Sequence, residues 1–184
     1  MIKHITFMTL TSLFLIGCGG TESVKGSGSA VDNTPKDYDL WAYMVPNTSN
    51  TNTFTLSSQN STSTYKTNYK VSQSRVEEIA DYAQDEKTVY TKEANKIVVS
   101  FEKNNKPNGI YELHLGANIN DIVTMRTSGC KLTKHLDTFT INQKAFADVI
   151  EITCDGIPGY YQKGVGEVAQ IEDSSGKNIR VLSN

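Results

Sequence analysis

The sequence contains no hydrophobic run long enough to cross a membrane as a helix. The apolar stretch near its start, residues 5–16, spans about a dozen residues, whereas a transmembrane helix needs about 20. Strong charge of one sign is also missing, because 18 Lys and Arg residues stand against 20 Asp and Glu residues and the formal net charge is −2. Without a basic field, we expect no nucleic-acid partner and no binding to anionic headgroups through charge.

Motifs for catalysis and metal binding are missing as well. The chain has no G-x-S-x-G elbow for a serine nucleophile and no C-x-x-C or H-x-x-x-H cluster. His114 follows Glu112, and His135 precedes Asp137, at a spacing that places each pair on one face of a strand by geometry alone. We interpret both as surface pairs. The sequence therefore predicts that the protein is not an enzyme and has neither a cofactor nor a metal site.

One glycine motif suggests nucleotide binding but lacks the required context. Gly164-Val165-Gly166-Glu167-Val168-Ala169 matches the G-x-G-x-x-G/A pattern of dinucleotide folds. Too few residues follow it for a crossover helix, a second strand and an acidic ribose partner. We interpret the glycines instead as allowing a bulge or a close strand crossing in a curved sheet.

The strongest motif lies at the amino end. Lys3 and His4 precede the apolar stretch, which ends in Leu15-Ile16-Gly17-Cys18. A basic start, a short apolar core and a small residue before the cut site are typical of a removable signal peptide, here residues 1–17. The final four residues resemble the lipobox of bacterial lipoproteins, which implies that Cys18 is lipidated and becomes the first residue of the mature protein. A single transmembrane anchor is the alternative, and its required length disfavours it.

The lipobox resemblance also implies a location. Gly19 rather than Asp follows the cysteine, which by resemblance to Gram-negative lipoproteins favours the outer membrane. Residues 18–37 are rich in Gly, Ser and Thr without an apolar rhythm, so they predict a flexible tether behind the lipidated cysteine. We expect the membrane as a partner through the Cys18 anchor, with residues 38–184 as one domain in the periplasm. Exposure at the cell surface stays open.

Two cysteines remain for the folded domain. An even pair in an exported protein is most simply a disulfide. If the chain folds back in one hairpin about Asn142, residues whose numbers add to 284 lie opposite each other, as Cys130 and Cys154 do. We therefore predict a Cys130–Cys154 disulfide, with two buried free thiols as the alternative.

Short β-type runs separated by polar turns fill the rest of the chain. Residues 65–71 and 110–115 alternate between apolar and polar side chains, and 96–101 holds an Ile-Val-Val run. The spacing predicts a mainly β domain with an antiparallel, strongly curved meander sheet of eight to ten strands, a half-barrel or open barrel. We expect a last hairpin from Tyr160 to Glu172 that returns through residues 178–182.

Two segments allow more than one interpretation. The aromatic stretch from Tyr38 to Val45 predicts either a first strand or an apolar plug. Residues 74–84 carry apolar side chains at helical spacing, and Ser74 with Glu77 matches a capping box. Their neighbours are β-like, so we predict a strand, with one short helix as the alternative.

The carboxyl-terminal third carries a second resemblance. Tyr160-Tyr161-Gln162-Lys163-Gly164-Val165-Gly166-Glu167-Val168 resembles a motif near the end of many uncharacterised bacterial envelope proteins and lipoproteins. There an aromatic pair and K-G-V-G-x-V lie on a final strand of an antiparallel, partly open barrel. Residues 140–150 resemble their preceding hairpin. The resemblance implies an architecture and leaves activity undefined.

Taken together, the sequence predicts a non-enzymatic lipoprotein with an interaction or structural role. Its Trp41 and tyrosines would form a contact surface. The alternative is a binding module whose curled sheet holds a lipid, acyl or peptide ligand in a groove. An enzyme is a third interpretation, which would need His114 or His135 at the centre of a pocket. The sequence names no ligand-binding residues.

Overall fold

The computed structural model describes residues 38–125, 129–171 and 178–183. The predicted signal peptide, the lipidated Cys18 and the tether lie outside these described residues. Residues 172–177, between the two expected halves of the last hairpin, also lie outside them.

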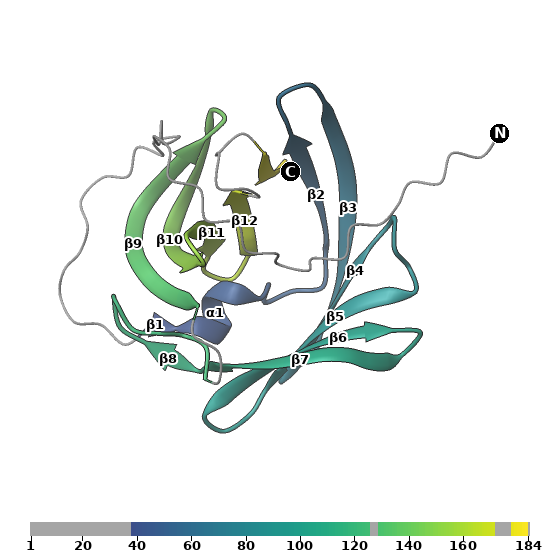
Figure 1. The fold of residues 1–184 in the computed structure, drawn as a ribbon, viewed down its shortest axis with the longest axis vertical. Helices are drawn as coiled ribbons and strands as arrows, with labels where there is room; N and C mark the ends of the chain where they lie inside the picture. Colours follow the sequence, from purple (N-terminus) through teal and green to yellow (C-terminus); the bar gives the residue numbers. More distant parts are fainter. Residues whose placement is uncertain (1–37, 126–128, 172–177, 184) are drawn as a thin grey trace.

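One large antiparallel sheet forms most of the domain. It contains 11 strands in the order β7-β6-β5-β4-β3-β2-β13-β12-β11-β10-β9. We call β2–β7 the first arm and β9–β13 the second arm; β2 pairs with β13 to join them. Figure 1 shows the two arms curving toward each other, and the sheet is not closed. The predicted fold class, a mainly β, strongly curved antiparallel meander, is confirmed.

The strands follow one another along the chain with short turns between most of them. The first arm consists of β2 (Thr51–Ser57), β3 (Thr62–Val71), β4 (Arg75–Ala80), β5 (Glu86–Lys92), β6 (Lys96–Lys103) and β7 (Lys106–His114). The second arm consists of β9 (Cys130–Ile141), β10 (Lys144–Cys154), β11 (Ile157–Gln162), β12 (Gly166–Ile171) and β13 (Ile179–Leu182). A separate two-stranded sheet pairs β1 (Tyr38–Asp39) with β8 (Gly116–Ala117).

The sheet has more strands than the predicted eight to ten. The expected strand from Tyr160 to Glu172 is in fact two strands, β11 and β12, with a turn at residues 163–165. Gly164 and Gly166 both have positive φ angles, 77° and 87°, which glycine adopts without a steric penalty. These torsions reverse the chain where an uninterrupted strand was predicted.

The same glycines allow a close approach to the segment after Ala42. A Cβ on Gly166 would lie 3.2 Å from Pro46 Cδ, and the Gly164 amide donates to the Ala42 carbonyl at 2.7 Å. The register also shifts between Tyr160 and Tyr161. The motif therefore combines a tight turn, a bulge and a close packing contact. The glycine motif packs against a short helix, described next, and against the segment that follows that helix. We had expected a bulge or a crossing strand at this position, and the bulge is present.

That helix, α1 (Leu40–Met44), fills one end of the space between the arms (Figure 1). Asp39 caps it, since Asp39 Oδ1 accepts from the Trp41 amide at 3.0 Å. Leu40 and Tyr43 are buried in a core that includes residues of both arms. The plug interpretation of this stretch is confirmed, and the strand interpretation holds only for the two residues of β1.

Residues 75–80 form the strand β4, as predicted, and pair with both β3 and β5. The helical alternative for 74–84 is wrong, because backbone pairing on both sides and burial of Val76 override the local helical spacing. The short helix of the described chain is α1.

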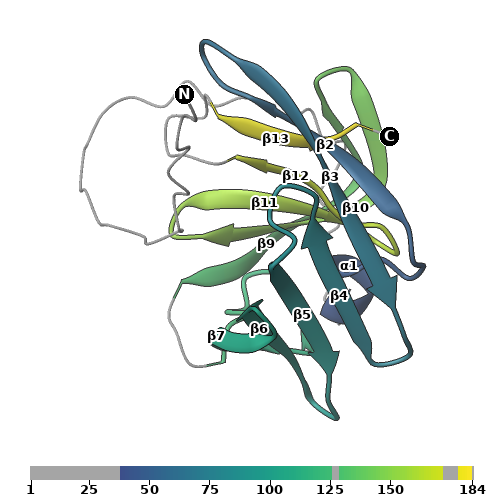
Figure 2. The ribbon, with the colours of Figure 1, turned by 90° about the vertical axis from the view of Figure 1, so that its right-hand side faces the viewer.

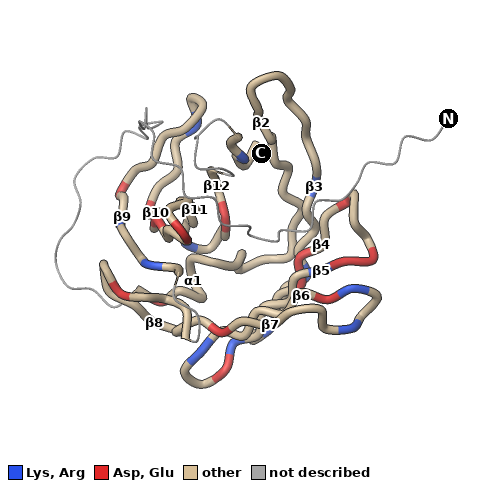
Figure 3. Tube along the Cα trace, in the orientation of Figure 1, with Lys and Arg blue, Asp and Glu red and all other residues tan. Residues whose placement is uncertain are grey.

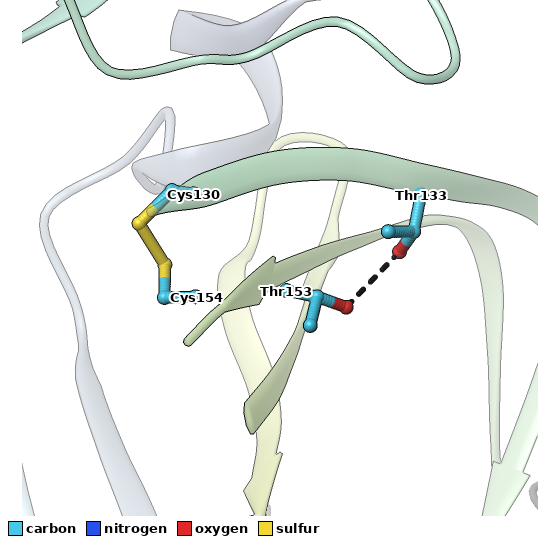
Figure 4. The surroundings of a disulfide bond; sticks show 4 residues. All are labelled: Cys130, Thr133, Thr153 and Cys154. Carbon is cyan, nitrogen blue, oxygen red and sulfur yellow. Dashed lines mark hydrogen bonds between the residues drawn. A yellow bond between two sulfur atoms is a disulfide. The ribbon is translucent and has the colours of Figure 1, made fainter. Parts of the chain in front are cut away.

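The β9–β10 hairpin carries the two cysteines. Asn142 and Gln143 form its two-residue turn, both with positive φ, as in a type I′ turn. Strand partners beside this turn have numbers that add to 285, not 284. A bulge between Glu151 and Ile152 then shifts the register by one and places Cys154 opposite Cys130. The structure joins these two residues in a disulfide (Figure 4).

Candidate functional site

A cavity of about 390 Å³ lies on the concave face of the sheet, between the first arm and strands β11–β13 of the second. Figure 2 shows β2 and β3 running obliquely in front of the second-arm strands. Strands of both arms contribute side chains, and Met44 of α1 contributes one from the plugged end. We call this space the sheet cavity.

Tyrosines dominate the aromatic part of its lining. They come from both arms and are Tyr65, Tyr69, Tyr82, Tyr90, Tyr111 and Tyr161. Burial raises the pKa of Tyr90, Tyr111 and Tyr161, and the nearby Glu78 carboxylate raises each of them further. These hydroxyls therefore stay protonated at neutral pH and are available as hydrogen-bond donors and acceptors.

Charged side chains make up much of the remaining lining. The basic residues each pair with a carboxylate of the same lining: Lys87 with Glu102 at 3.4 Å, Lys103 with Glu86 at 2.6 Å, and Arg180 with Glu167 at 2.7 Å. The Arg180 guanidinium binds both Glu167 oxygens and also the Gln170 side chain. Figure 3 shows acidic and basic residues mixed along β4 to β7.

Glu78 is the fourth carboxylate of the lining and differs from the other three. Among the described residues, no Lys, Arg or His forms an ion pair with it. The Tyr90 hydroxyl donates to Glu78 Oε2 at 3.0 Å. Burial, followed by the charge of Glu167, raises the pKa of Glu78 above its ordinary value. The side chain is partly accessible because it faces the cavity, although protein surrounds it.

Sequence reasoning did not identify Glu78, Glu167 or Arg180. For Glu78 a usable pattern exists, because in a strand Val76 and Glu78 lie on the same face and Val76 is fully buried. A carboxylate on the inward face of a strand is costly and therefore informative. For the Glu167–Arg180 pair, the contact depends on the pairing of β12 with β13.

The predicted aromatic contact surface is not formed by most of the residues proposed for it. Trp41 is half-buried, with Lys92 Nζ 5.8 Å from its ring centroid. Of the nine tyrosines only Tyr82 is exposed, at 61%. The others pack in the core or face the sheet cavity, so the tyrosines mainly build the interior.

The two histidines lie on opposite edge strands of the large sheet, His114 on β7 and His135 on β9. The structure does not bring them together in one site. In the Glu112–His114 pair, the Glu112 carboxylate binds Lys96 Nζ at 2.5 Å.

The surface interpretation of His135 is wrong, because its side chain is buried. Its Nε2 lies 2.8 Å from Asp148 Oδ1, while its distance to Asp137 is 3.9 Å. The Tyr43 hydroxyl donates to the same Asp148 oxygen at 2.6 Å. Burial alone would raise the pKa of Asp148, but the hydrogen bonds from Tyr43 and His135 lower it overall. This cluster ties α1 to the second arm.

Comparisons with known proteins leave the family open. No protein-family model matches the chain, and no curated protein or solved structure matches it. Within residues 38–125, 129–171 and 178–183, no three His, Cys, Asp or Glu side chains are grouped to hold a metal ion. No helix in the same part of the chain is long and apolar enough to cross a membrane.

Proposed function

We propose that this protein is a non-enzymatic, lipid-anchored binding module of the cell envelope that holds a small ligand in the sheet cavity. The cavity itself carries the proposal. Its volume of about 390 Å³ falls within the range of small-molecule sites, about 300–1,000 Å³.

The lining favours a polar, compact ligand over an acyl chain. Six tyrosines and three ion pairs present hydroxyls, carboxylates and flat aromatic faces to the same space. An acyl chain would displace water from these polar groups and offer no hydrogen bonds in return, which costs free energy. Among the ligand classes expected from sequence, the lining thus fits lipid tails least well and favours a molecule with hydrogen-bonding groups.

The pocket assignment is tested by native mass spectrometry of the full protein purified from its own membrane. We expect a retained small molecule, released on unfolding. Ala80→Phe, which places a ring into the cavity lining, should abolish retention, while Ala147→Phe on the exposed face of β10 should preserve it. If both variants and the parent carry no ligand at all, the binding proposal fails.

The membrane anchor is a separate part of the proposal and rests on the lipobox resemblance. With Cys18→Ser, we expect the protein to remain unprocessed and to lose its lipid, since acylation of that sulfur is required. Detergent-phase partitioning and the mass of the mature protein measure this. Partitioning of the variant equal to that of the parent would contradict the anchor.

A further inference from the structure

We propose, on the basis of the binding function above, that the ligand of the sheet cavity carries a substituted ammonium group, bound beside the Glu78 carboxylate and among Tyr69, Tyr90 and the other ring faces. The chemical class is an organic cation such as a quaternary ammonium or an amine.

The charge balance of the lining supports a cationic ligand. Four carboxylates and three basic residues line the cavity, and each basic side chain pairs with one of the other three carboxylates. Lys87 also binds Glu77, which lies on the opposite face of β4 from Glu78, so on the face of Glu78 the balance is Glu78, Glu86 and Glu167 against Lys103 and Arg180. Glu78 is left with hydrogen bonds from tyrosine hydroxyls, an unfavourable interaction with Glu167 and a favourable one with Arg180 that falls short of an ion pair. A buried carboxylate without an ion-pair partner is costly, and a ligand cation beside Glu78 would supply that partner.

The aromatic lining supports an organic cation in particular. Rings attract cations to their faces, and tyrosines surrounding a carboxylate suit a bulky ammonium that sheds its water easily. The same cavity already uses this interaction, since Arg180 Cζ lies 5.9 Å from the Phe54 ring centroid. Hard metal ions prefer six or more oxygen ligands, which one carboxylate among rings does not supply.

The pH dependence of binding follows from the surroundings of Glu78. The titratable and charged groups around it come from β3, β5, β7, β11, β12 and β13 and are Tyr69, Tyr90, Tyr111, Tyr161, Glu167 and Arg180. The tyrosines stay protonated and Arg180 stays charged near neutral pH. An ammonium ligand needs the ionised carboxylate, so its affinity should fall as pH decreases through the raised pKa of Glu78.

The test compares choline with 3,3-dimethylbutan-1-ol, which has the same shape but a carbon in place of the charged nitrogen. Isothermal titration calorimetry is run on the full mature protein, stripped of ligand by unfolding and refolding. We expect choline to bind about tenfold more tightly than the alcohol. Dodecylphosphocholine is then compared with dodecyl maltoside, which has the same alkyl chain but no ammonium group. Binding of dodecylphosphocholine without binding of free choline would identify a lipid headgroup, not a free solute, as the source of the ammonium group.

Glu78→Gln is the decisive variant, because it removes the charge and retains an oxygen that can accept from Tyr90. We expect about a tenfold loss of choline affinity and no change for the alcohol. Glu93→Gln removes the same charge outside the cavity lining, where Lys96 keeps its pairing with Glu112; it is the matched control and should change choline affinity little. Since burial disfavours the charge, Glu78→Gln should also unfold at a higher midpoint than the parent.

The outcomes separate this inference from the proposed function. Equal affinity for choline and the alcohol, or undiminished choline binding by Glu78→Gln, would overturn the cation assignment and leave the binding module standing. Binding of dodecylphosphocholine alone would support the ammonium site with a lipid headgroup as its source. If no probe binds and the native protein retains no molecule, the cation assignment and the binding function both fall.

Discussion

Replacing Cys130 and Cys154 together by serine should lower the free energy of unfolding by about 3 kcal/mol. The two residues are separated by 24 positions, and a cross-link over such a loop restricts the unfolded chain by about 3 to 3.5 kcal/mol in the loop-entropy account. Denaturant unfolding of the parent and the double variant measures this difference. The midpoint concentration and the slope of the free energy of unfolding against denaturant concentration are determined for each protein.

The position of the disulfide makes a local effect expected as well. Cys130 begins β9, an edge strand of the large sheet, and its carbonyl accepts from the Val123 amide at 2.9 Å. The Val123 carbonyl in turn accepts a hydrogen bond from the amide of His114, which lies on β7, the other edge strand of the sheet. Loss of the cross-link should therefore speed amide exchange at Val123 and His114 more than in β3.

Reduction provides the control for the cysteine prediction. Dithiothreitol should destabilise the parent by about as much as the double substitution does, and should leave the double variant unchanged. Free thiols that react with a labelling reagent in the native, unreduced protein would contradict the cross-link itself. An unchanged midpoint after complete reduction would contradict its energetic role.

Phe139→Ala should lower the free energy of unfolding by about 4 kcal/mol, the typical cost of removing a fully buried aromatic ring. Phe139 is only 1% exposed and stacks on Tyr160, with the ring centroids 4.0 Å apart. Its core includes Phe54 of β2 and Val181 of β13, the strands that join the two arms. The void left by the missing ring would weaken the packing of the core against β2 and β13, the two strands that join the arms.

Phe101→Ala is the matched control for Phe139→Ala. Phe101 is 46% exposed at the rim of the sheet cavity, so its truncation should cost less than about 1 kcal/mol. Urea unfolding followed by near-ultraviolet circular dichroism compares the two variants. Similar losses at both positions would show that the buried stack of the second arm does not dominate stability.

The raised pKa of Glu78 implies that this side chain lowers the stability of the folded protein while it serves the proposed binding of a cation. A carboxylate whose pKa is raised by burial weakens the folded state at neutral pH, since the unfolded chain solvates the charge freely. Proteins retain such groups mostly at functional sites. Glu78 lies in a cavity lined by tyrosines from both arms, where the proposed ligand cation would offset this cost.

The bond between Cys130 and Cys154 illustrates how far sequence reasoning reached. Strand spacing and an even cysteine count led to the pairing, with a hairpin about Asn142. The turn is in fact shared by Asn142 and Gln143, and alone it would have placed Cys130 opposite Asp155. The bulge near Thr133 corrects the register by one residue. Thr133 donates to the Glu151 side chain at 2.6 Å, a contact that sequence spacing did not reveal.

By itself, the sequence determined the mainly β class and the pairing of the cysteines, and it favoured a strand within residues 74–84, while it left residues 38–45 open between a strand and a plug. These features depend on side-chain alternation, turn residues and neighbours close along the chain, which a linear pattern records. Only the tertiary structure decided the sheet cavity, the position of Glu78 without an ion pair among the described residues, and the contact of His135 with Asp148. Those depend on β2 pairing with β13, which are separated by more than half of the chain, and on two bulges that reset the register. The free energy of such distant pairing belongs to the whole packed sheet, so no local segment encodes it.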